Sequence, residues 1–187
     1  MKTSLKFLGG IPLIALLAAC GGGNNDDEPI NYTSFSDIQL EAGNLFAAYD
    51  SAAISEFGEL PSGGTASYQG FVRGDLDVPD ADQDEFAGQL TLTADFSNDE
   101  ITEGRAYNLL REDSSGIEGE LTLDSGSIKN NGGVAEVSAT LSGLLDGVGS
   151  FMSLDGDFKS GSQAIEGIIS GTIAGDNIDG GDFIADQ

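Results

Sequence analysis

From Thr65 to the end of the chain, apolar and polar residues alternate in a series of short segments. Alternation with a period of two is the pattern of β-strands that bury one face and leave the other in water. Runs rich in Gly, Asn, Asp and Ser separate these segments and are typical of tight turns. The pattern predicts about eight strands, within residues 66–76, 89–96, 101–110, 118–124, 135–141, 152–158, 165–173 and 178–184.

Strands at intervals of roughly a dozen residues are the rhythm of a β-sandwich or a β-barrel. The polar faces carry Asp, Glu, Thr and Gln, where a transmembrane barrel has lipid-facing apolar residues and aromatic girdles. Glycines within the strands allow the bends of a small barrel, and closure leaves no exposed strand edge. We therefore predict an all-β fold with an eight-stranded antiparallel β-barrel over residues 61–187.

Residues 36–60 show a different pattern, in which apolar residues recur at spacings of three and four. This spacing predicts one short amphipathic helix before the barrel, since positions three and four apart share a helix face. Ser36 is the expected N-cap, and Gly58 and Pro61 end the helix. A strand-like or irregular segment is the alternative, because Gly43 interrupts the pattern.

The first 20 residues have the features of a bacterial lipoprotein signal. Two lysines precede an apolar stretch at 7–17, which is shorter than the about 20 residues that a membrane-spanning helix needs. The stretch leads into Leu-Ala-Ala-Cys, which resembles a lipobox, and this cysteine, Cys20, is the only one in the chain. We predict a lipoprotein signal peptide over residues 1–19, a diacylated Cys20 as the first mature residue, and a lipidated N-terminus and flexible linker over residues 20–35. An ordinary secretory signal is the alternative.

The composition excludes several kinds of function. After removal of the signal peptide with its two lysines, five of the seven Lys and Arg remain against 32 Asp and Glu, which gives a net charge of −27. The chain contains no His, which excludes His-based catalytic triads and imidazole metal sites. No further cysteine is present for a disulfide, a thiolate zinc site or a nucleophile. The negative charge opposes binding to nucleic acid, and we expect a monomer with no cofactor and no enzymatic activity.

The densest group of carboxylates lies between the first two predicted strands. Asp80, Asp82 and Asp84 have the alternate spacing of the first three ligands of a calcium-binding EF-hand loop. Glu85 stands where that loop needs Gly, and Thr91 stands where it needs Glu. We therefore keep the three aspartates as calcium candidates by spacing alone and favour a solvated acidic hairpin loop.

Three segments of the predicted barrel resemble the β-barrel domain of surface lipoproteins like transferrin-binding protein B. Residues 61–70 (PSGGTASYQG) are similar to the entry into the family's first barrel strand, and residues 90–96 (LTLTADF) are similar to a later strand. Residues 171–183 (GTIAGDNIDGGDF) are similar to the family's closing Gly-rich segment. The resemblance implies an eight-stranded barrel on an outer-membrane lipoprotein, displayed at the cell surface and linked to iron, haem or host-protein binding. Gly21, and not Asp, follows Cys20, which favours the outer membrane.

These features predict an outer-membrane, lipid-anchored surface binding protein that presents barrel loops to a ligand. The resemblance suggests iron, haem or a host iron-carrier protein as the ligand. Tyr68 and Tyr107 have the chemistry of haem ligands, but we expect both side chains to pack at the barrel wall. A structural envelope lipoprotein without a specific ligand is the alternative. A carboxylate hydrolase is a further alternative, which requires two acidic residues to converge on one cleft.

Overall fold

The structure, a computed structural model, describes residues 32–78 and 84–187. The predicted signal peptide, Cys20 and two of the three calcium candidates, Asp80 and Asp82, lie outside the described residues. Within the described part, one α-helix and a short 3-10 helix precede nine β-strands. The elements are α1 (Phe35–Tyr49), η1 (Phe57–Glu59), β1 (Thr65–Asp77), β2 (Asp84–Asp95), β3 (Glu100–Arg111), β4 (Gly116–Ile117), β5 (Gly119–Asn131), β6 (Val134–Leu145), β7 (Val148–Lys159), β8 (Ala164–Ile173) and β9 (Asp176–Asp186).

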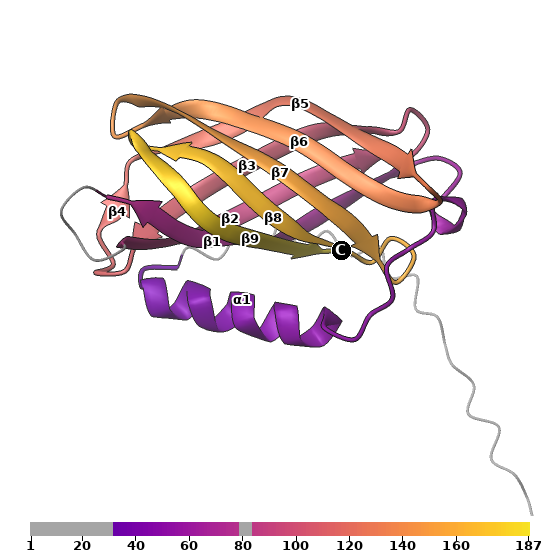
Figure 1. Ribbon diagram of the computed structural model, residues 1–187, viewed down its shortest axis with the longest axis horizontal. Helices are drawn as coiled ribbons and strands as arrows, with labels where there is room; N and C mark the ends of the chain where they lie inside the picture. Colours follow the sequence, from indigo (N-terminus) through magenta and orange to yellow (C-terminus); the bar gives the residue numbers. More distant parts are fainter. Residues whose placement is uncertain (1–31, 79–83) are drawn as a thin grey trace, which may run out of the picture. The chain divides into compact units, whose positions relative to one another are not determined.

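Eight of these strands form a closed antiparallel barrel in which sequence neighbours pair with each other (Figure 1). The order runs β1, β2, β3, β5, β6, β7, β8 and β9, and the pairing of β9 with β1 closes the barrel. The remaining strand, β4, has two residues and pairs with the end of β3. The predicted eight-stranded antiparallel barrel is therefore confirmed, with one short strand added. Closure gives each long strand a partner on both sides, which removes the exposed edges of an open sheet.

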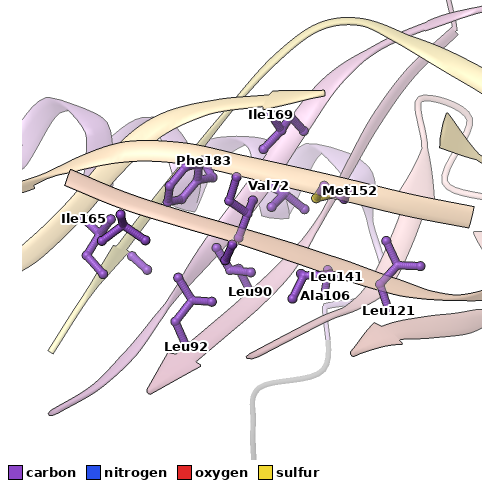
Figure 2. Close-up of a cluster of buried hydrophobic side chains, with 14 of the residues drawn as sticks. Val72, Leu90, Leu92, Ala106, Leu121, Leu141, Met152, Ile165, Ile169 and Phe183 are labelled. Carbon is purple, nitrogen blue, oxygen red and sulfur yellow. The ribbon is translucent and has the colours of Figure 1, made fainter. Parts of the chain in front are cut away.

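Apolar side chains from all eight long strands fill the barrel interior (Figure 2). They are the residues that the alternation places on the apolar faces, such as Leu90, Leu92 and Ala94 on β2. Full burial of a Leu, Ile or Phe side chain stabilises a fold by about 1.5–3 kcal/mol, so this interior is the main source of stability. The largest fully buried side chains there include Tyr68, Leu76, Phe86, Leu121, Leu141, Phe158 and Phe183.

The N-terminus of α1 differs by one residue from the helix predicted over residues 36–60. Ser34, and not Ser36, is the N-cap, and its hydroxyl accepts a hydrogen bond from the Asp37 amide at 3.4 Å. Ser36 lies within the helix, and its hydroxyl lies 2.7 Å from that of Ser34. Two serines two residues apart give the same capping signal in the sequence, and the hydrogen bond distinguishes them.

The C-terminus of α1 lies at Tyr49, well before the predicted end. Beyond it the chain forms two isolated β-bridges, Ile54 with Lys159 of β7 and Glu56 with Val134 of β6. These bridges hold the main chain in an extended conformation that a helix cannot share. The apolar spacing continues past Tyr49, but pairing with the barrel outweighs the helical preference of this segment, because propensity is a weak effect.

The helix α1 lies against the outside of the barrel, over β1, β2 and β9 (Figure 1). Phe35 and Ile38 of the helix cluster with Ala87 and Leu110 of the wall, and Phe71 borders them. These wall residues occupy positions that face water elsewhere on the barrel. The helix therefore creates a small second core, and the polar outer face of the alternating strands is replaced by an apolar one beneath it.

The segment after α1 covers one end of the barrel. Phe57 and Leu60 of this segment pack against the interior cluster. Beneath it, the buried Tyr68 hydroxyl donates a hydrogen bond to the Ser162 carbonyl at 2.7 Å and accepts one from the Gln187 amide nitrogen at 3.1 Å. Burial raises the pKa of Tyr68 to about 12. The phenol therefore stays neutral over the physiological range and acts as a structural hydrogen-bonding group.

Candidate functional site

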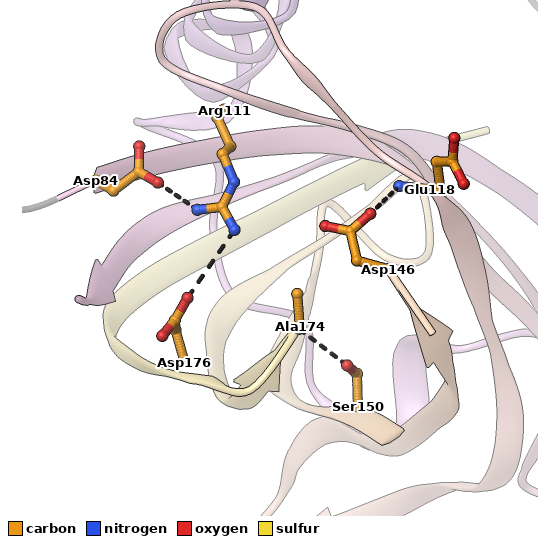
Figure 3. Close-up of polar contacts among 7 residues, drawn as sticks. All are labelled: Asp84, Arg111, Glu118, Asp146, Ser150, Ala174 and Asp176. Atoms are coloured by element: carbon orange, nitrogen blue, oxygen red, sulfur yellow. Dashed lines mark hydrogen bonds and ion pairs between the residues drawn. The ribbon is translucent and has the colours of Figure 1, made fainter. Parts of the chain in front are cut away.

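The opposite end of the barrel carries a group of polar contacts around Arg111 (Figure 3). Arg111, at the end of β3, forms an ion pair with Asp84 of β2 and lies 3.9 Å from a carboxylate oxygen of Asp176 on β9. Asp84 is the third calcium candidate, and its carboxylate is already compensated by this guanidinium. Among residues 32–78 and 84–187, no group of three or more Cys, Asp or Glu is placed to hold a metal ion.

The turns at this end are short and held by hydrogen bonds (Figure 3). Two residues join β6 to β7, and two join β8 to β9. The Asp146 carboxylate accepts a hydrogen bond from the Glu118 amide at 2.8 Å, and the Asp146 amide donates to the Glu118 carbonyl at 2.9 Å. The Ser150 hydroxyl accepts a hydrogen bond from the Ala174 amide at 2.9 Å. These turns therefore offer a ligand few free side chains, and the barrel wall offers more.

A groove of about 610 Å³ lies on the outer wall, between α1 and the strands β1, β8 and β9. Charged and small residues make up most of its lining, and a single large apolar side chain, Ile168, borders it. A groove of this size accommodates a small molecule or part of a peptide. The lining residues are Gln39, Arg73, Gly74, Asp75, Glu85, Ile168, Gly180, Gly181 and Asp182.

An ion pair between Arg73 and Asp182 lies in this groove. The two residues are opposite each other on β1 and β9, and the guanidinium donates two hydrogen bonds to the carboxylate, at 2.7 and 3.0 Å. The guanidinium also lies 4.4 Å from the ring centre of Phe46 on α1. Hydrogen bonding to Asp182 raises the pKa of Arg73 further. The charge of Asp182 is thus compensated within the fold.

Two other carboxylates in the groove form no ion pair within the described part of the chain. Asp75 on β1 and Glu85 on β2 are directly opposite each other in the strand register, and both line the groove. Like charges in this arrangement destabilise a strand pair. Within the described residues, no Lys or Arg forms an ion pair with either of them.

The pairing of β8 with β9 is interrupted beside the groove. Ile168 pairs with Asp182 and Thr172 pairs with Asn177, but the residues between these pairs have no partner across the two strands. The unpaired stretch is one residue longer on β9 than on β8. It includes Gly180, whose φ of +107° is rarely adopted by residues other than glycine. This bulge lies beside β1, since the Gly180 carbonyl oxygen faces Gly74 across the strand pair.

A second hollow, of about 270 Å³, lies on the other side of Ile168 over β6 and β7. Asp155 and Asp157 line it, and burial together with the charges of Glu136 and Glu166 raises the pKa of Asp157. Ile168 borders both hollows and is 66% exposed, the highest fraction for a large apolar side chain in the described part. We define the Ile168 face as the outward surface that contains Asp75, Glu85, Asp155, Asp157 and Ile168.

Of the two tyrosines considered as haem ligands, Tyr107 packs at the barrel wall, whereas Tyr68 belongs to the interior cluster. Tyr68 points into the covered end of the barrel. Tyr107 is half-buried, and its hydroxyl accepts a hydrogen bond from the side-chain amide of Gln89 at 3.4 Å. The guanidinium of Arg105 lies 4.5 Å from the centre of its ring. Both phenols therefore have structural partners.

The sequence prediction did not identify the Ile168 face. One local signal was present, because Ile168 occupies a polar-face position of its strand, between Glu166 and Ser170. The partners of Ile168 were not visible from the sequence. Asp75 and Asp182 are more than a hundred residues apart and meet in the groove only because β1 pairs with β9.

No model of a known protein family matches the chain, and no curated protein is similar enough in sequence to match it. The described part of the chain contains no helix that is both long and apolar enough to cross a membrane. The fold defines a small closed antiparallel barrel with one external helix. The resemblance to proteins like transferrin-binding protein B rests on the three sequence segments and stays a prediction.

Proposed function

We propose that this protein is a non-enzymatic, lipid-anchored binding protein of the outer membrane, displayed at the cell surface. Cys20 carries the lipid, and residues 21–31 separate it from the described fold. The ligand is held on the outside of the barrel, at its loops and its wall. Iron, haem or a host iron-carrier protein are the targets that the sequence resemblance suggests.

The observation that carries this proposal is the groove of about 610 Å³ on the outer wall of a barrel whose interior is packed with side chains. Because side chains fill the barrel interior, the ligand binds on the outer surface. The groove lies on a closed sheet, and regular scaffolds that present polar side chains are a usual basis of recognition.

The arrangement of acids in the groove favours binding over hydrolysis. A glycosidase-like mechanism needs one carboxylic acid in a protected environment next to a carboxylate. Asp182 is engaged by Arg73, while Glu85 is exposed on the surface. Release of reducing ends from polysaccharides by wild type, abolished in Asp75→Asn and Glu85→Gln variants, would establish the hydrolase instead.

Thermal melts of the purified protein against haem, ferric chelates, iron-carrier glycoproteins and Ca²⁺ test the proposed function. A ligand that binds only the folded state raises the melting midpoint by mass action, and about 2.7 kcal/mol of stabilisation is expected at a hundredfold excess over Kd. A saturable rise with haem, iron or a carrier is the expected result. A rise with Ca²⁺ alone would instead assign a role to the acidic residues from Asp80 to Asp84.

Membrane fractionation with metabolic palmitate labelling tests the anchor separately. The wild-type protein is expected in the membrane fraction with the label, and Cys20→Ser is expected in the soluble fraction without it. Membrane association that persists in Cys20→Ser contradicts the lipid anchor. A single acyl chain binds only marginally, so stable association reports at least two chains.

A structural envelope lipoprotein is the second candidate function. The two-residue turns between β5 and β6, β6 and β7, and β8 and β9 favour it, because they leave little loop surface for a ligand. This candidate predicts no saturable shift with any ligand. It also predicts that loss of the protein changes envelope integrity without changing iron uptake.

A further inference from the structure

We propose that the Ile168 face docks a basic segment of a partner protein, an extended stretch rich in Lys or Arg that also carries an apolar side chain. The inference rests on the proposed function, since it names the kind of partner that this binding protein takes. Three features of the face carry it: an apolar side chain exposed among acids, an excess of acidic over basic side chains, and two hollows that flank the apolar side chain.

The apolar anchor of the face is Ile168. In the strand register it stands directly between Asp155 on β7 and Asp182 on β9. Side chains opposite each other on neighbouring strands have Cβ atoms about 4.5–5.5 Å apart, so these carboxylates surround an isoleucine that is 66% exposed. An apolar contact from a partner removes this side chain from water. Asp182 is paired with Arg73, so the Asp155 carboxylate selects the charge of the partner's flanking residues.

The charge of the face favours a basic partner over other occupants. The two hollows are lined by six carboxylates and two cations, Arg73 and Lys129, so acidic side chains are in excess. Asp75, Glu85, Asp155 and Asp157 form no ion pair within residues 32–78 and 84–187. The whole chain has a net charge of −25, so a second copy of this protein and a nucleic acid are both repelled. A Lys- or Arg-rich segment is attracted over a distance of about 10 Å at moderate salt.

The shape of the face suits an extended segment. The hollows of about 610 and 270 Å³ lie on opposite sides of Ile168, so a chain that crosses β7, β8 and β9 enters both. Its central apolar side chain contacts Ile168, and its basic side chains reach the acids on either side.

Fluorescence anisotropy with a labelled peptide of alternating Lys and Leu tests the inference on the full chain at physiological salt. Saturable binding is expected, whereas a peptide of alternating Glu and Leu is expected not to bind. Ile168→Asn is expected to weaken binding about tenfold through loss of the apolar contact. The double variant Asp155→Asn/Asp157→Asn is expected to weaken it by a similar factor and to flatten its salt dependence.

Matched variants outside the face separate specific docking from general charge attraction. Leu144→Asn removes another exposed apolar side chain, 64% exposed on β6, and Glu100→Gln/Glu118→Gln removes two carboxylates elsewhere on the surface. Both are expected to bind the Lys–Leu peptide within about twofold of wild type, as distant surface changes do. Equal losses in the face and control variants, or no peptide binding at all, would overturn the inference.

The melts with iron-related ligands separate this inference from the proposed function. A melting shift with haem or an iron carrier, combined with no binding of the Lys–Leu peptide, overturns the basic-segment inference and leaves the binding function standing. Peptide binding that depends on Ile168, combined with no response to any iron-related ligand, supports the inference and removes iron from the proposed function.

Discussion

Arg73 on β1 and Asp182 on β9 stand opposite each other across the seam that closes the barrel, joined by two hydrogen bonds of 2.7 and 3.0 Å. The same guanidinium lies 4.4 Å from the ring centre of Phe46 on α1. One cation therefore connects the first barrel strand, the last barrel strand and the helix. Two-bond pairing of Arg with a carboxylate is the geometry in which a partly exposed ion pair contributes measurable stability.

Arg73→Ala is expected to lower the free energy of unfolding by about 1–2 kcal/mol, measured by urea denaturation. The loss combines the two hydrogen bonds, the contact with Phe46 and the repulsion of an unpaired Asp182 from its neighbours. Arg105→Ala is the matched control, because its pair with Glu120 is more exposed and involves one hydrogen bond at 2.6 Å. The control is expected to cost no more than about 0.5–1 kcal/mol, and an equal cost would contradict a special role for the seam.

Tyr68→Phe is expected to cost about 1–2 kcal/mol at neutral pH, because the Ser162 carbonyl and the Gln187 amide lose their buried partner. Burial raises the pKa of Tyr68 to about 12 in the folded state, against about 10 in an unfolded chain. The neutral phenol therefore favours folding below pH 10, and this contribution is lost as the pH rises toward 12. Chemical denaturation across that range is expected to show a steeper loss for wild type than for the variant. Parallel pH profiles would contradict the buried hydroxyl.

Asp157→Asn is expected to stabilise the protein slightly at pH 7, by no more than about 0.5 kcal/mol for this half-buried group. Burial and the charges of Glu136 and Glu166 raise the pKa of Asp157 above its unfolded value. Folding then favours the protonated acid, so wild type regains stability as the pH falls through the folded pKa, and the difference from the variant narrows. Asp155→Asn removes the same charge two residues away and controls for net charge. A difference that widens on acidification would contradict the raised pKa.

Two Gly→Ala substitutions are expected to have opposite effects. A Cβ at Gly70 on β1 overlaps the Ile184 carbonyl oxygen of β9, so Gly70→Ala is expected to cost about 3 kcal/mol or to prevent closure. A Cβ at Gly43 in α1 meets nothing within 4 Å, so Gly43→Ala is expected to stabilise the protein by about 0.5–1 kcal/mol through helix propensity. Melting midpoints of both variants check the pair, and a loss of stability in Gly43→Ala would contradict the free helix surface.

Ile38→Ala tests the attachment of α1 to the wall. Ile38 is fully buried against the outer face of the barrel, and its truncation is expected to cost about 2–4 kcal/mol in unfolding experiments. Leu40→Ala, on the exposed side of the same helix, is expected to change stability by less than about 0.5 kcal/mol. Similar costs for the two variants would show that the helix packs on a different face.

The barrel strands were predictable because their signal is local. In β2 and β6, every second residue is apolar, and a strand places alternate side chains on opposite faces. The same alternation on all eight long strands leaves one apolar surface that only a closed or stacked sheet can bury. The fold class and the inward-facing residues therefore followed from the sequence, as did the presence of one helix before the barrel.

The sequence by itself determined the strands, their buried faces and the strongly acidic surface, because these depend on neighbours along the chain. The tertiary structure decided the end of α1 at Tyr49, where bridges to β6 and β7 replace helix, and the apolar outer wall beneath that helix. It also decided the Ile168 face, which joins residues of β1, β2, β7 and β8. Barrel closure brings these distant residues together, and no local pattern encodes which outward side chains meet across a seam.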